Sequence, residues 1–144
     1  MRNIIVGVDG SESARKALSW AIEEAKVRKC EVIAINAWTY PIVPPSIDGA
    51  IVTIPDIDVE QEANNLLERE IKEVTGGSDD VKIQRRFVHK SAATALIQAS
   101  DDADMLVIGS RGLGGFRGLL LGSVGHQCVQ HSKCPVVVIP HDER

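Results

Sequence analysis

The feature that most constrains the fold is an alternation between short apolar runs and segments with a helical period. Five runs have the length and composition of strands: NIIVGV at residues 3–8, EVIAINAW at 31–38, VKIQRRFV at 81–88, DMLVIG at 104–109 and CPVVVIP at 134–140. Runs rich in Val and Ile that are apolar at nearly every position are typical of parallel strands covered on both faces. The run at 81–88 alternates apolar and polar residues instead, which predicts a strand at a sheet edge.

The segments between these runs predict helices. One stripe of apolar residues at helical spacing comprises Ala14, Ala17, Leu18, Ala21, Ile22 and Ala25, and a second comprises Val59, Ala63, Leu66, Leu67, Ile71 and Val74. Ser11 or Ser13 is the expected N-cap of the first helix, and Gly76 and Gly77 are expected to stop the second. A shorter helix is expected over residues 92–99, and a last one after Gly122. Strands alternating with helices predict an α/β fold with a mainly parallel sheet, as one domain over residues 1–144.

Composition excludes several functional classes. Only 3% of residues are aromatic and the net charge is −4, which argues against nucleic-acid binding through stacking or broad phosphate contacts. No apolar run approaches the roughly 20 residues that span a membrane, and the N-terminus lacks a signal-peptide pattern. The cysteines number three and form no CxxC pair, which predicts reduced thiols and a cytoplasmic protein. Cys128 is expected to be buried and structural.

The segment between Thr39 and Ile57 interrupts the alternation of strands and helices. It carries four of the six prolines and is long for a connection within a compact domain. Two interpretations stay open, a lid or partner-binding loop and a surface insertion without such a role.

Glycines cluster near the C-terminal end of the chain. Residues 109–125 contain seven of the 12 glycines, and no Asp or Glu occurs from Met105 to His141. This local excess of positive charge suits a small anion, although a helix and strand that merely lack acids would look the same. The stretch is not a Walker A loop, because Gly122 stands where that motif requires Lys, and it lacks the third glycine of GxGxxG.

What the stretch does contain is Gly109, Gly112 and the pair Gly122-Ser123 at a spacing of G-x2-G-x9-G-S. A glycine turn that leads into a helix leaves backbone N–H groups and the positive end of the helix dipole available to an anion. Ser123 either donates its hydroxyl to a phosphate or caps its own helix. The histidines show no HExxH pattern, and no acid lies near His126 or His131 in the sequence, so no metal site made of protein ligands is expected.

The pattern G-x2-G-x9-G-[ST], framed by LVIGSRG and GSVGHQCVQHSKCPVVVIP, resembles the ATP-binding branch of the universal stress protein family. The opening IIVGVDGSESARKALSWA is similar to that family's first strand and helix. The resemblance implies a Rossmann-like fold with a five-stranded parallel sheet in the order 3-2-1-4-5 and helices on both faces. In such a sheet the strand order reverses between the first and fourth strands, where α/β proteins bind ligands.

The resemblance also implies which residues meet the ligand, which is ATP or a related adenine nucleotide, with or without Mg²⁺. An acid matching Asp9 contacts the nucleoside, backbone matching Ala37 faces the adenine, and the glycine loop and Ser123 hold the phosphates. The residues expected at the nucleotide are Gly7, Val8, Asp9, Ala37, Gly109, Ser110, Arg111, Gly112, Gly122, Ser123 and Val124. From position alone, Asp9 also suits a turn or helix entry, and Arg111 and Arg117 are loop arginines of a kind that is more often solvated.

The function expected is therefore that of a nucleotide-responsive regulatory protein of the stress response, with no catalytic residues. The motif supplies amides and a serine but no evident general base, which disfavours a turnover enzyme. The alternatives are a slow ATPase or phosphotransferase, a binder of cyclic AMP, and a nucleotide-free structural dimer. The resemblance suggests a homodimer through the apolar strand at residues 135–139, which would cover a sheet edge.

Overall fold

The structure is a computed structural model, and it describes residues 2–38, 59–111 and 121–140. Its five strands are β1 (Asn3–Gly7), β2 (Glu31–Ala37), β3 (Ile83–Val88), β4 (Met105–Gly109) and β5 (Val136–Ile139). They form one sheet in the order β3-β2-β1-β4-β5, and every neighbouring pair is parallel. The predicted fold class and strand order are therefore confirmed.

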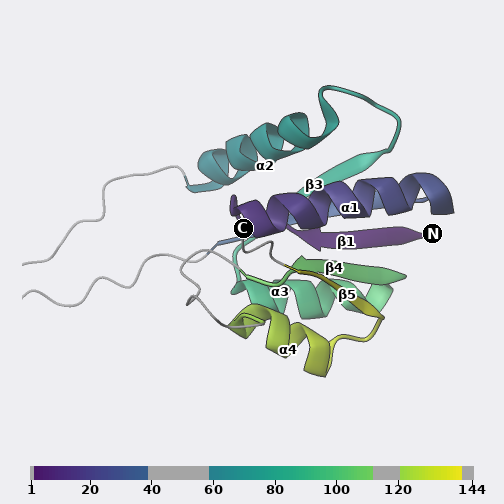
Figure 1. The fold of residues 1–144 in the computed structure, drawn as a ribbon. Helices are drawn as coiled ribbons and strands as arrows, with labels where there is room; N and C mark the ends of the chain where they lie inside the picture. The colour runs from purple at the N-terminus through teal and green to yellow at the C-terminus, as the bar shows by residue number, and fades with distance from the viewer. Residues whose placement is uncertain (1, 39–58, 112–120, 141–144) are drawn as a thin grey trace, which may run out of the picture.

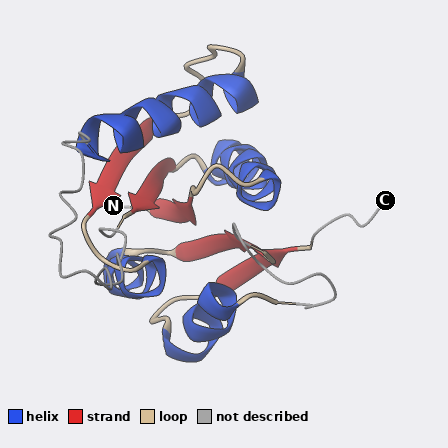
Figure 2. Cartoon of the chain, turned by 90° about the vertical axis from the view of Figure 1, so that its left-hand side faces the viewer, coloured by secondary structure: helices blue, strands red, loops and turns tan. Residues whose placement is uncertain are grey.

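The helices cover both faces of this sheet (Figures 1 and 2). They are α1 (Glu12–Arg28), α2 (Val59–Thr75), α3 (Ala92–Ala99) and α4 (Ser123–His131), with a 3₁₀ turn, η1 (Ser100–Asp102), after α3. One core lies between the sheet and the pair α1 and α2, and the other lies on the opposite face toward α3 and α4. Strand β1 is buried on both faces as expected, since Ile4 and Val6 belong to the first core and Ile5 to the second.

Helix α1 shows why the sequence folds this way. All six residues of its predicted apolar stripe are buried, and Leu18 is completely inaccessible. Burying a side chain of that size stabilises a fold by about 1.5–3 kcal/mol. Ser11 is the N-cap, and its Oγ accepts a hydrogen bond from the Ala14 amide at 3.1 Å. Of the two predicted caps, Ser11 is therefore the correct one.

The edge position of β3 is confirmed, but its alternation is weaker than predicted. Arg85 and Arg86 are exposed, whereas Ile83 and Gln84 are both partly buried although they point to opposite faces. Gln84 is partly covered because its side-chain amide donates to Glu31 Oε1 on the neighbouring strand at 3.1 Å. Hydrogen bonding across the sheet thus protects a polar side chain that the pattern placed in water.

Cys128 anchors α4 to the second core, as predicted. Its side chain is fully buried, and burial raises the pKa of the thiol to about 11. Cys30, Cys128 and Cys134 are all free thiols. Within the described residues, no helix is long and apolar enough to cross a membrane.

Candidate functional site

The candidate site lies where β1 and β4 end side by side. The two strands are paired in parallel from Ile4 opposite Met105 to Val6 opposite Val107, so their carboxyl ends emerge at the same edge. Figure 2 looks at this edge of the sheet. The chain leaving β1 enters α1 on one face, and α4, which follows β4, lies on the other. The strand order therefore reverses between β1 and β4, which is the topological position where open α/β sheets bind ligands.

The backbone that follows β1 is held by β2. The Val8 amide donates to the Ile35 carbonyl at 2.8 Å, and the Val8 carbonyl accepts from Asn36 Nδ2 at 2.8 Å. Asn36 is 8% exposed, so this side-chain bond is made inside the protein, where it is difficult to replace with water. Asn36 could not be predicted from the sequence, because a single polar residue in an apolar strand has no periodic signature.

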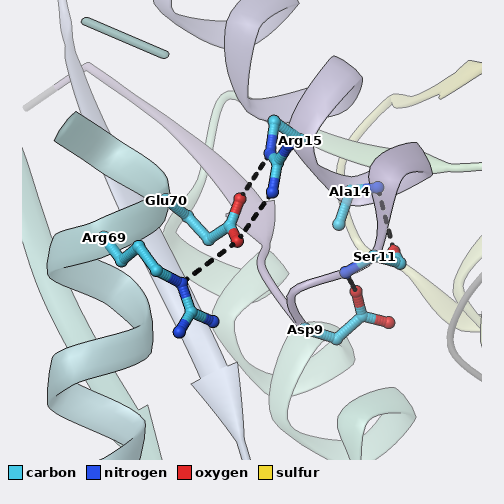
Figure 3. A network of polar contacts seen from close by, with 6 residues as sticks. All are labelled: Asp9, Ser11, Ala14, Arg15, Arg69 and Glu70. Carbon is cyan, nitrogen blue, oxygen red and sulfur yellow. Dashed lines mark hydrogen bonds and ion pairs between the residues drawn. The ribbon is translucent and has the colours of Figure 1, made fainter. Parts of the chain in front are cut away.

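Asp9 makes the turn into α1. Its Oδ1 accepts a hydrogen bond from the Ser11 amide at 2.9 Å, and Gly10 has a φ of +87°, a conformation that favours glycine. Figure 3 shows Asp9 beneath the first turn of α1. The turn role of Asp9 is therefore real, and it directs the carboxylate to the carboxyl edge of the sheet.

The end of β4 is tied into the fold by backbone hydrogen bonds. The Ser110 amide donates to the Ile139 carbonyl at 3.0 Å, and the Ser110 carbonyl accepts from the Gly122 amide at 2.8 Å. The Arg111 amide donates to Ser13 Oγ at 3.2 Å. The amides of Ser110, Arg111 and Gly122 thus have partners within the protein. Among the described residues of the motif, the donors left for an anion are those in the first turn of α4.

The N-cap of α4 is a glycine. Gly122 stands at this position in an extended conformation with φ −73° and ψ 172°, and it has no side chain with which to cap the helix. Ser123 is the first helical residue, so the interpretation of Ser123 as its own helix cap is wrong. Its exposed hydroxyl accepts a long contact of 3.5 Å from Gln127 Nε2. The amides of the first turn have no acceptors within the helix, and Val124 is 38% exposed there.

Glycine is required at position 109 because α1 packs against the strand there, and not because its backbone amide must be accessible to a ligand. A Cβ at this position would lie 2.7 Å from both the carbonyl carbon and the carbonyl oxygen of Ser13. Real Cβ atoms do not approach backbone atoms so closely, so the first turn of α1 can rest on β4 only where the strand has glycine. The glycine motif therefore has two separate purposes, close packing at Gly109 and an uncapped helix at Gly122.

Ala37 ends β2, beside a pocket that the sequence did not predict. The next residue, Trp38, stacks on His89 with ring centroids 4.1 Å apart and planes within 4°. Trp38 and Asn36 line a pocket of about 490 Å³ together with Leu66 and other residues of α2. A Cβ at Gly10 would meet Leu66 Cδ1 at 3.2 Å, so Leu66 also contacts the turn that contains Asp9.

A buried carboxylate connects α1 and α2 near this turn (Figure 3). Glu70 is 1% exposed, and it accepts hydrogen bonds from Arg15 Nε at 2.7 Å and Arg15 Nη2 at 3.2 Å. Arg69 Nε lies 3.9 Å from Glu70 Oε1. The hydrogen bond and the charge of Glu70 raise the pKa of the Arg15 guanidinium. Glu70 was missed, although its position three residues after Leu67 places it on the apolar stripe of α2.

The remaining predicted residues have defined places or lie outside the description. Gly7 closes β1, and a Cβ there would meet Leu96 Cδ1 at 3.0 Å. Gly112 and Arg117 lie outside the described residues, as does the segment between Thr39 and Ile57. Among the described residues, no group of three or more His, Cys, Asp or Glu side chains could hold a metal ion.

Comparison with known proteins agrees with this geometry. The family model described as the universal stress protein family matches residues 1–140. A universal stress protein of Mycobacterium tuberculosis is 35% identical over 138 residues, which cover 94% of this chain and 44% of that protein. The chain thus spans less than half the length of this curated relative.

Two solved structures share the fold. A universal stress protein in complex with cAMP superposes with a TM-score of 0.70 at 24% identity, covering 96% of this chain and 95% of that one. The Archaeoglobus fulgidus universal stress protein in complex with dAMP gives a TM-score of 0.69 at 23% identity, covering 96% and 98%. With the strand order, the glycine spacing and the family match in agreement, the chain belongs to the universal stress protein family.

Proposed function

We propose that this chain binds an adenine nucleotide, with ATP as the preferred ligand, at the carboxyl ends of β1 and β4. The observation that carries the proposal is the amino terminus of α4, which begins at Gly122 without a side-chain cap. The first-turn amides and the helix dipole favour a phosphate at this position. Two proteins of the same fold are described as complexes with cAMP and dAMP, which supports an adenine nucleotide as the ligand class.

The phosphates are proposed to lie against the first turn of α4. There the Ser123 hydroxyl donates to a phosphate oxygen, and Val124 contributes a backbone amide. Gly109, Ser110 and Arg111 form the adjacent wall together with Gly112. Gly122 lets the phosphate approach the amides of the first turn, because any side chain at the N-cap would stand between these amides and the phosphate.

The nucleoside is proposed to extend from the phosphates toward β2. Gly7 and Val8 lie beneath it, the Asp9 carboxylate accepts from a ribose hydroxyl, and the backbone at Ala37 faces the adenine. This direction follows the sheet edge from β4 through β1 to β2, the order in which the strands are paired. Asp9 is suited to this role because its turn orients the carboxylate before any ligand arrives.

A regulatory role explains these residues better than turnover. Efficient phosphoryl transfer needs charge neutralisation and a positioned nucleophile. No Asp or Glu occurs between Met105 and His141, so the α4 side of the site offers no carboxylate as a general base. The Asp9 carboxylate is engaged with the Ser11 amide and belongs to the nucleoside end. We therefore propose that the nucleotide acts as an effector that changes the conformation of the protein or its choice of partner.

A homodimer through β5 is part of the same proposal. Residues Val136–Ile139 form the edge strand of the sheet, and each of them is only partly buried in the single chain. A second copy related by a two-fold axis would cover this edge and its apolar side chains. Sedimentation equilibrium at micromolar concentration is expected to give twice the mass of the chain, and a monomer there would refute this part.

Titration calorimetry tests the ligand class. Protein freed of co-purified nucleotide by refolding is titrated with ATP, ADP, AMP, cAMP and adenosine, each with and without Mg²⁺. Saturable one-to-one binding is expected, with ATP binding more tightly than adenosine because only the phosphates reach α4. Equal affinity for ATP and adenosine would contradict the phosphate site, and an absence of heat with every ligand would refute the function. A parallel turnover assay separates a binder from an ATPase.

A further inference from the structure

Ser13 connects the first turn of α1 to the end of β4. Its side chain is buried, with 4% of the residue exposed, and its Oγ accepts a hydrogen bond from the Arg111 amide at 3.2 Å. The two residues are 98 positions apart in the sequence. Because Ser11 caps α1, the Ser13 hydroxyl is not needed for the helix end and is directed at the neighbouring strand instead.

The contact around this hydrogen bond is tight. The space of a Cβ at Gly109 is occupied by Ser13, whose carbonyl atoms would lie 2.7 Å away. The first turn of α1 therefore rests directly on the backbone of β4, with little freedom to slide. Such close packing makes the spacing between these two segments a fixed property of the fold.

From β4 the connection continues to α4. The Ser110 carbonyl accepts a hydrogen bond from the amide of Gly122, the N-cap of α4, at 2.8 Å. Two hydrogen bonds, Ser13 with Arg111 and Ser110 with Gly122, thus join the first turn of α1 to the start of α4. On its other side, the same turn of α1 holds Asp9 through the Ser11 amide.

We infer that Ser13 is a positioning residue for the nucleotide, and this inference rests on the proposed function. Ser13 sets the distance between the Asp9 turn, which meets the nucleoside, and the first turn of α4, which meets the phosphates. A ligand that spans both ends gains affinity when that distance is fixed before binding. Adenosine lacks phosphates and so does not depend on it. Ser13 therefore acts through the backbone of Arg111 and Gly122, and it affects how much the phosphates add to the binding affinity.

Ser13→Ala tests this inference against a matched control, Ser100→Ala. Ser100 is also buried, at 1% exposure, and its Oγ likewise accepts a backbone amide, that of Lys133, at 2.9 Å. It lies in η1, on the connection between α3 and β4 and away from the Asp9 turn. Each substitution removes one buried hydroxyl that accepts an amide, so both are expected to lower the melting temperature.

Only Ser13→Ala is expected to change nucleotide binding. Its affinity for ATP should fall about three- to tenfold, as expected for one misplaced hydrogen-bonding group, and its affinity for adenosine should stay within about twofold. Ser100→Ala should change neither. A Ser13→Cys variant keeps an acceptor at this position, although a larger and weaker one, and its affinity for ATP is expected to lie between those of wild type and Ser13→Ala.

Hydrogen exchange at the Arg111 amide supplies a readout of the bond itself. Exchange is expected to be faster in Ser13→Ala than in wild type and unchanged in Ser100→Ala. An equal loss of affinity for ATP and adenosine would overturn the inference, and so would unchanged ATP affinity in a variant with an accelerated Arg111 amide. If wild-type protein binds no nucleotide, the proposed function fails, which is a different result from binding that is insensitive to Ser13.

Discussion

The amino termini of α1 and α4 lie at neighbouring strand ends but are completed in opposite ways. At α1, Ser11 Oγ accepts from the Ala14 amide at 3.1 Å, and α3 repeats this arrangement through Ser91 and the Thr94 amide at 3.3 Å. At α4 the N-cap is Gly122, which has no side chain to offer. Serines thus cap α1 and α3, whereas α4 has a glycine at the same position. Under the proposed function, this contrast separates a structural helix end from one that binds a phosphate.

Gly122→Asp should produce the largest effect, because it gives α4 the kind of cap that α1 has. The φ and ψ of Gly122 suit any residue, so the fold is expected to survive, with a change of only a few tenths of a kcal/mol in the free energy of unfolding. The new carboxylate would accept from the first-turn amides and repel phosphate. We expect ATP affinity to fall at least about 100-fold by calorimetry.

Gly122→Asn separates the two causes of that loss, since Asn caps a helix without a negative charge. Its ATP affinity is expected to lie between those of wild type and Gly122→Asp. If Gly122→Asp binds ATP as tightly as wild type while remaining folded, α4 does not hold the phosphates and the contrast with α1 has no functional meaning.

Asp9→Ala and Ser123→Ala should test the nucleoside end and the phosphate end of the site separately. Each is expected to lower ATP affinity less than Gly122→Asp does. Loss of the Asp9 carboxylate is expected to weaken ATP and adenosine by the same factor, about three- to tenfold, because both ligands carry the ribose. Loss of the Ser123 hydroxyl should weaken ATP by a similar factor and leave adenosine unchanged. Calorimetry with both ligands measures the split. If both variants lose ATP affinity and adenosine affinity in the same ratio, the nucleoside and phosphate ends of the site are not assigned correctly.

Ser11→Ala should have the smallest effect on binding, because it removes a cap that is complete without ligand. Its free energy of unfolding is expected to fall by about 1 kcal/mol in urea denaturation, as for other lost N-caps. ATP affinity should change less than about twofold. Ser91→Ala, which removes the equivalent cap of α3, is the matched control and should show the same loss. A fall in ATP affinity for Ser11→Ala alone would mean that α1 also contacts the ligand.

Much of the architecture was predictable because it follows repeating patterns. The apolar stripe of α1 is fully buried as expected, and helix α3 occupies residues 92–99 as predicted. The strand order followed from the family resemblance, and the edge position of β3 also followed from its alternation. Glycine spacing indicated where α4 begins. Apart from the strand order, each of these signals is local in sequence, so periodicity or a short motif is enough to reveal it.

The contacts that organise the site were not predictable in the same way. Ser13 with Arg111 and Asn36 with Val8 join residues that are distant in the sequence, and neither pair leaves a periodic trace. Glu70 is buried in the stripe of α2 because Arg15 of α1 neutralises it, a partnership that depends on how the two helices pack. The N-cap of α4 was not identified from the sequence for a related reason. Gly and Ser are both acceptable N-caps, so the pair Gly122-Ser123 is ambiguous by one residue.

The most direct test of the central claim is an amide NMR titration with ATP and with adenosine. If the uncapped turn of α4 binds the phosphates, the amides of Ser123, Val124 and Gly125 should shift strongly with ATP and little with adenosine. The amide of Ala14, whose acceptor is Ser11, should move little with either ligand. Equal shifts at α4 with ATP and adenosine, or no shifts there with ATP, would contradict the claim that this helix end is left open for a nucleotide.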